Sequence, residues 1–212
     1  QWLLREGGTF FDIGANIGSY ALVASEQEKA HVFAFEPHPV TATLLSENIQ
    51  LNGRNNVTVC RMALGQSDGM VRLTDHAGSS VNHAVVRDDA GTVEVPCRRV
   101  ETFCRERGVL PQYVKVDVEG FEFEVLAGFG ALLSRVEFLL IECNGLAEQR
   151  SVGAKAIHEL LMAEKFRGPY RCDIETKTLL DHAGLSREDA IYLREPVCKT
   201  LREHGWLVER WG

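Results

Sequence analysis

Short apolar segments alternate with helical patterns along most of this sequence, and that alternation limits the possible fold more than any other feature. The spacing predicts helices between the segments, most clearly over 39–51, where apolar residues recur every three to four positions. Strands that alternate with helices indicate βαβ units and a mostly parallel sheet with helices on both faces. We therefore expect an α/β fold. The segments that predict its principal strands are 9–13, 31–35, 57–64, 113–118 and 136–143.

The chain length fits one domain of ordinary size, because 212 residues can bury a full core. We expect residues 1–212 to form a single domain, with its binding motifs within 9–144. Residues 145–212 are then predicted to add a helix and late strands that complete the sheet. The sequence leaves open whether a native segment precedes Gln1.

Composition and charge argue against several classes of partner and location. The formal net charge of −7, without a basic run, disfavours binding to a nucleic acid backbone. No apolar segment is long enough to span a bilayer, and the first residues do not resemble a secretory signal, so we expect no membrane partner. The six cysteines include no C-x-x-C pair, which argues against a zinc ribbon and favours reduced thiols in a cytoplasmic protein. A homodimer is possible.

The first predicted strand ends in a glycine-containing turn that suits a bound ligand. Gly14 and Gly18 allow a tight turn and a close backbone approach, and the following helix offers free N–H groups. A dinucleotide fingerprint G-x-G-x-x-G would need glycine at Asn16 and Ser19, so a pyrophosphate turn is not encoded. Asp12 precedes the turn, where a carboxylate attracts an ammonium or a sulfonium. A plain turn before a helix is the alternative.

Two further segments follow the second and third predicted strands. Glu36 lies 18 residues past Gly18 and is suited to accept hydrogen bonds from both hydroxyls of a ribose. Ala63 lies in a short segment that is a candidate for contact with an adenine edge. An ordinary tight turn explains the same segment equally well.

Acidic side chains gather after the later strands. Asp117, Glu119 and Glu122 follow the strand at 113–118, and Glu142 follows the next one. Carboxylates grouped at the end of a buried strand are costly unless they bind a ligand or pair with cations. A solvated acidic rim is the alternative.

Taken together, these motifs resemble the FkbM family of methyltransferases in order and spacing over roughly residues 9–144. The resemblance implies a Rossmann-like, seven-stranded class I methyltransferase fold, S-adenosylmethionine as cofactor, and methyl transfer to a hydroxyl of a sugar, glycan or other small molecule. It also implies that Glu36 binds the ribose and that Asp117 lies under the methyl donor. The residues that it places at the methionine part are Asp12, Gly14, Asn16 and Gly18. The segments that carry it are FFDIGANIGSY, FAFEPHP, NNVTVCRMALG, YVKVDVEGFEFEVL and LLIECN.

Methyl transfer to an alcohol requires a base for the hydroxyl proton. We rank Glu119 and His38 first, with Asp117 beside the donor, ahead of Glu142 and His83. Oxygen ligands from Asp117, Glu142 and Asn144 leave a metal-assisted variant open, but ordinary hydrogen bonding explains them and we expect no metal.

Two other functions remain as alternatives. A nicotinamide-dependent oxidoreductase would use the same fold and Glu36, but the missing glycine pattern disfavours it. A non-catalytic protein with a methyltransferase fold should have lost the cofactor turn or the acids at the strand ends, and this sequence keeps both.

Overall fold

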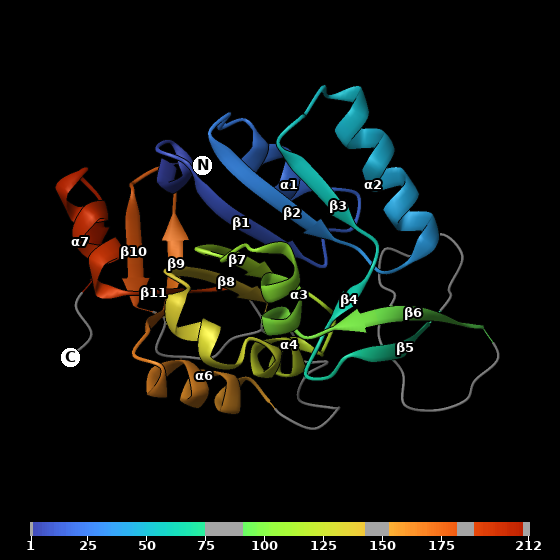
Figure 1. Cartoon of the computed structure of the whole chain (residues 1–212). Coiled ribbons are helices and arrows are strands. Elements are labelled where there is room, and N and C mark those ends of the chain that lie inside the picture. Colours follow the sequence, from blue (N-terminus) through green and yellow to red (C-terminus); the bar gives the residue numbers. More distant parts are fainter. Residues whose placement is uncertain (1, 75–90, 143–152, 182–188, 210–212) are drawn as a thin grey trace.

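The computed structural model describes residues 2–74, 91–142, 153–181 and 189–209 (Figure 1). Its centre is a nine-stranded sheet in the order β12-β10-β9-β11-β8-β7-β1-β2-β3. The five strands from β3 to β8 run parallel, whereas β11 is antiparallel to both β8 and β9. The strands of this sheet are β1 (Gly8–Ile13), β2 (Ala30–Phe35), β3 (Val57–Cys60), β7 (Tyr113–Val116), β8 (Phe138–Glu142), β9 (Arg167–Asp173), β10 (Thr178–Asp181), β11 (Asp189–Leu193) and β12 (Leu207–Val208).

Helices cover both faces of the sheet, which explains why neighbouring residues of one strand are buried on opposite sides. In β1, Phe11 belongs to the core cluster that includes residues of α3, α4 and α6, whereas Phe10 belongs to the cluster that includes residues of α1 and α2. A separate cluster joins α7 to β9, β10 and β11. The helices are η1 (Trp2–Leu4), α1 (Ser19–Ser25), α2 (Pro39–Leu51), α3 (Val100–Arg107), α4 (Glu122–Gly128), η2 (Gly130–Arg135), α6 (Ala154–Ala163) and α7 (Glu195–Glu203).

A second, three-stranded sheet lies beside the carboxyl ends of the first strands (Figure 1). It consists of β4 (Ala63–Leu64), β5 (Gly69–Thr74) and β6 (Thr92–Arg98), and β5 pairs with β6 in antiparallel register. The sequence predicted one strand over 57–64, but the chain turns after Cys60, whose carbonyl accepts a hydrogen bond from the N–H of Met62 at 2.9 Å. The remainder, β4, then pairs with β6 and leaves the large sheet.

The prediction of a mostly parallel α/β sheet is confirmed, and the differences have local causes. The helix that follows the glycine turn begins at Ser19, because Asn16 and Gly18 have left-handed backbone angles of φ 50° and 99°. The described sheet holds nine strands instead of seven, since β10 and β12 extend the edge beyond β9. The sequence did not predict β9, because its Gly168-Pro169 pair is unusual inside a strand.

Strand order reverses between β1 and β7, because the chain passes from β1 outward to β3 and then returns to β7. Open parallel sheets bind ligands beyond the carboxyl ends of the strands at such a reversal. None of the described helices combines the length and apolar character that crossing a membrane requires.

Candidate active site

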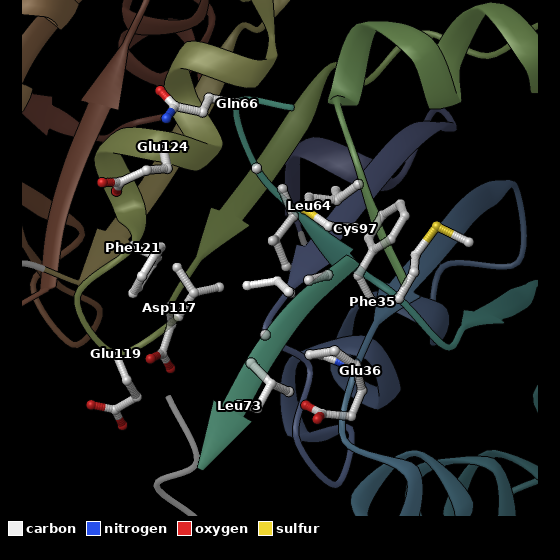
Figure 2. Close-up of a pocket in the computed structure, with 18 of the residues that line it drawn as sticks. Phe35, Glu36, Leu64, Gln66, Leu73, Cys97, Asp117, Glu119, Phe121 and Glu124 are labelled. Atoms are coloured by element: carbon white, nitrogen blue, oxygen red, sulfur yellow. The ribbon is translucent and has the colours of Figure 1, made fainter. Parts of the chain in front are cut away.

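A cavity opens at this reversal, between the carboxyl ends of β1, β2 and β7 on one side and the small sheet on the other. Figure 2 shows Glu36 on one side of the cavity and Asp117 with Glu119 on the opposite side. Six of the residues predicted for the site line it together: Gly14, Asn16, Glu36, Ala63, Asp117 and Glu119.

The turn after β1 is held by contacts within the chain. The N–H groups of Gly14 and Ala15 both donate to the carbonyl of Phe35, at 3.0 and 2.9 Å. A Cβ atom on Gly14 would lie 1.8 Å from the carbonyl oxygen of Asp117, and one on Gly18 would lie 2.6 Å from a methyl of Leu45. The sequence suggested that these glycines let the backbone approach a ligand closely. In the structure, Gly14 also allows close packing against Asp117, and Gly18 allows close packing against Leu45.

Glu36 is fixed at the edge of the cavity by two backbone donors. Its carboxylate accepts hydrogen bonds from the N–H of Asn16 at 3.0 Å and of His38 at 2.9 Å. Burial raises the pKa of Glu36, and these two hydrogen bonds act in the opposite direction. Each carboxylate oxygen can accept more than one hydrogen bond, so a diol in the cavity could also donate to Glu36.

Three predicted site residues are not among those that line the cavity: Asp12, Gly18 and His38. Asp12 is fully buried behind the turn, where its Oδ1 lies 3.5 Å from the ammonium of Lys115. Burial raises the pKa of Asp12, and the charge of Lys115 opposes that shift. His38 is buried at the start of α2, with its Nδ1 3.4 Å from the hydroxyl of Thr41.

Carboxylates from two adjacent strand ends meet at the far side of the cavity. Oxygen atoms of Asp117, Glu119 and Glu142 all lie within 4.8 Å of one another. Burial, followed by the hydrogen bond and negative charge of Asp117, raises the pKa of Glu142 to about 8. The cluster can therefore retain a proton at neutral pH, and three carboxylates at this spacing could also accommodate a hard cation.

Glu122 shapes the turn that presents Glu119. Its buried carboxylate accepts hydrogen bonds from the N–H groups of Val118 and Gly120, at 3.1 and 3.0 Å. Within that turn Glu119 and Gly120 have left-handed backbone angles, with φ of 54° and 99°. Burial raises the pKa of Glu122. Its two hydrogen bonds to the backbone of the turn give this carboxyl a structural role.

The charge on the cavity wall is negative. Four carboxylates line it, and no lysine, arginine or histidine occurs among the described lining residues. A pyrophosphate would meet repulsion here without a compensating cation, whereas a sulfonium or an ammonium would be attracted. The four acids are Glu36, Asp117, Glu119 and Glu124.

Sequence reasoning missed the wall that the small sheet supplies. Met70, Val71 and Leu73 of β5 and Cys97 of β6 line the cavity, as does Phe121. Apolar residues at strand spacing carry no sign that they face a ligand rather than the core. His83 and Asn144, which the sequence suggested as a base and a metal ligand, lie outside the described residues.

The strand order of the sheet and the turn after β1 are those of a class I methyltransferase fold. A ribosomal RNA methylase from Streptococcus thermophilus has a similar structure, with a TM-score of 0.50 at 10% sequence identity over 89% of each chain. That similarity concerns the fold alone.

The chain belongs to the FkbM methyltransferase family, because the model of the methyltransferase FkbM domain matches residues 12–168. It is 33% identical over 151 residues to the hexuronic acid methyltransferase AglP of Haloferax volcanii, covering 70% of this chain and 61% of the relative. It is 31% identical over 195 residues to the 2-O-methyltransferase NoeI of Sinorhizobium fredii, covering 82% of this chain and 79% of the relative. The chain thus spans about three fifths of the length of the Haloferax protein.

Membership of this family confirms the resemblance seen in the sequence. The cofactor is therefore S-adenosylmethionine. The cavity fits that molecule, which carries a positive charge on its sulfonium and a ribose diol. The described wall offers carboxylates to both features and no cation for a phosphate.

Proposed function

We propose that this chain transfers the methyl group of S-adenosylmethionine to a hydroxyl oxygen of a sugar or glycan. The observation that carries the proposal is the cluster of the Asp117, Glu119 and Glu142 carboxylates, of which Asp117 and Glu119 line the cavity on the side opposite Glu36. Two relatives named for methylation of a hexuronic acid and for 2-O-methylation support a sugar as the acceptor.

The cavity supports a specific division of roles for the cofactor. Glu36 would accept hydrogen bonds from the ribose hydroxyls, Ala63 would contact the adenine, and Gly14 with Asn16 would border the methionine part. Asp117 faces the positively charged end. Asp12 and Gly18 are not among the residues that line the cavity, so we assign them an indirect role in supporting the turn after β1.

Glu119 is the proposed base. We prefer it to His38 because Glu119 lines the cavity and His38 does not. When bound, S-adenosylmethionine supplies an electrophilic methyl group on a sulfonium. The acceptor oxygen would form a bond to that methyl carbon, and the sulfur would leave with the electron pair of the broken carbon–sulfur bond. Glu119 takes the hydroxyl proton. The raised pKa of Glu142 supports a cluster that retains one proton at neutral pH.

The negative charge of the chain and of the cavity wall would repel the phosphates of a nucleic acid, which supports an acceptor of another class. The formal net charge is −7, and the described lining residues include no cation that would bind a phosphate.

A labelling assay tests the proposed activity. The protein is incubated with S-adenosylmethionine that carries a tritiated methyl group, together with p-nitrophenyl glycosides of hexuronic acids, neutral hexoses and deoxyhexoses. We expect label in at least one glycoside, as a methyl ether that survives mild alkali. Label released by mild alkali would identify a carboxyl ester and contradict a hydroxyl acceptor. Label in RNA but in no glycoside would contradict a sugar acceptor.

A further inference from the structure

Lys115 is a buried cation that the proposed chemistry leaves without a role. It lies in β7 and is only 4% exposed. A buried ammonium is costly unless it is paired and hydrogen-bonded, so its partners indicate what it holds in place.

The ammonium of Lys115 contacts three separate parts of the site. It donates a hydrogen bond to the carbonyl of Gly14 at 2.8 Å, in the turn after β1. It lies 3.2 Å from Oδ2 of Asp117 and 3.5 Å from Oδ1 of Asp12. Of these three contacts, the one with the Gly14 carbonyl is a hydrogen bond and the two with carboxylates are ion pairs.

These contacts follow from strand register. Asp12 and Lys115 are direct neighbours across the parallel pair of β1 and β7, so their side chains lie on the same face of the sheet. Asp117 is two residues further along and belongs to the same face. The ammonium nitrogen also lies 5.4 Å from the ring centre of Tyr20, which follows the glycine turn.

We propose that Lys115 is a positioning residue that fixes the Gly14 carbonyl and the Asp117 carboxylate relative to each other, and thereby sets the affinity for the cofactor. This inference rests on the proposed function, because Gly14 and Asp117 border the same cofactor. It adds that the two sides of the cofactor site are joined through one ammonium.

The charge of Lys115 gives the inference a second consequence. Asp117 lines the cavity, and Lys115 partly neutralises it. Loss of that neutralisation should favour a cationic ligand over a neutral one of the same shape. S-adenosylmethionine carries a sulfonium, whereas S-adenosylhomocysteine has a neutral thioether in its place.

The test compares two variants that differ only at Lys115. Lys115→Met alone would leave Asp12 buried beside no cation and could prevent folding. We therefore compare Asp12→Asn with Asp12→Asn/Lys115→Met, since neither leaves a buried aspartate unpaired. Lys155→Met, on the exposed surface of α6, is the control for loss of a lysine. Each variant is titrated by calorimetry with S-adenosylhomocysteine and S-adenosylmethionine, and its thermal unfolding is measured.

We expect the double variant to bind S-adenosylhomocysteine at least about tenfold more weakly than Asp12→Asn, as the loss of hydrogen bonds to a charged group predicts. The preference for S-adenosylmethionine over S-adenosylhomocysteine should rise by about threefold or more. A merely structural lysine would leave both quantities unchanged in folded protein, and that result overturns the inference. Failure of the unaltered protein to bind either ligand would overturn the proposed function as well, so the two failures are distinguishable.

Discussion

At the residue scale, Glu119 and Asp117 allow catalysis to be separated from cofactor binding. Glu119→Gln removes the proposed base but keeps the shape of the side chain, so turnover should fall by about 10²–10⁴-fold while cofactor affinity stays nearly unchanged. Asp117→Asn should damage both, because Asp117 lines the cavity and pairs with Lys115. Glu159→Gln, on exposed α6, is the control.

The measurement is steady-state turnover on the glycoside that the labelling assay identifies, together with calorimetry of S-adenosylhomocysteine. Near-normal turnover of Glu119→Gln would exclude Glu119 as the base and leave Asp117 as the other carboxyl of the cluster that lines the cavity.

Glu142 should make the stability of the protein depend on pH. Its pKa is raised to about 8 in the folded chain, mainly by burial, from an ordinary value of 4.5. The folded state therefore binds more protons than the unfolded state between these values. The stability that Glu142 contributes is fully present below about pH 4.5 and is lost as the pH rises through 8.

Urea unfolding of the protein and of Glu142→Gln at pH 6 and pH 9 tests this sign. Glu142→Gln cannot ionise, so its free energy of unfolding should fall less than that of the unaltered protein between the two pH values. An equal fall in both would show that Glu142 does not cause the dependence.

At the element scale, the turn after β1 depends on close packing against the end of β7. Gly14→Ala would place a Cβ 1.8 Å from the Asp117 carbonyl oxygen, whereas Gly53→Ala meets nothing within 4 Å. Both glycines have left-handed backbone angles, so both variants carry a strain of about 1–2 kcal/mol. We expect Gly53→Ala to cost about that much and Gly14→Ala to cost clearly more, or to prevent folding.

Chemical unfolding measures both costs on the same scale. Equal destabilisation by the two substitutions would contradict the packing role assigned to Gly14.

The sequence predicted the elements well wherever one pattern decided the outcome. Continuous apolar strands, the glycine turn and the acids after the strands all follow from local patterns, and Glu36, Asp117 and Glu119, which these patterns singled out, line the cavity. What could not be predicted depends on contacts between distant residues. His38 follows a strand as Glu36 does, yet the start of α2 buries it outside the lining.

Two other features depend on the sheet rather than on local sequence. Lys115 gains its role only because strand register brings Asp12 beside it. The wall formed by β5 and β6 arises because β4 leaves the large sheet to pair with β6.

At the scale of the whole molecule, the carboxyl-terminal strands are integral to the large sheet. β11 pairs with β8 along its full length, from Asp189 with Glu142 to Leu193 with Phe138. We therefore predict that residues 1–212 unfold as one cooperative domain, with coincident transitions in fluorescence and circular dichroism. Two separate transitions would indicate that residues 145–212 form an independent unit.

The acidic cavity should bind S-adenosylmethionine rather than a nicotinamide cofactor. The most direct test is a calorimetric titration of the unaltered protein with S-adenosylhomocysteine and, separately, with NADH. We predict micromolar affinity for S-adenosylhomocysteine, about −8 kcal/mol, and no binding of NADH. Glu36→Ala should weaken the binding of S-adenosylhomocysteine by about tenfold or more. No heat with millimolar S-adenosylhomocysteine in folded protein, or tighter binding of NADH, would contradict the claim.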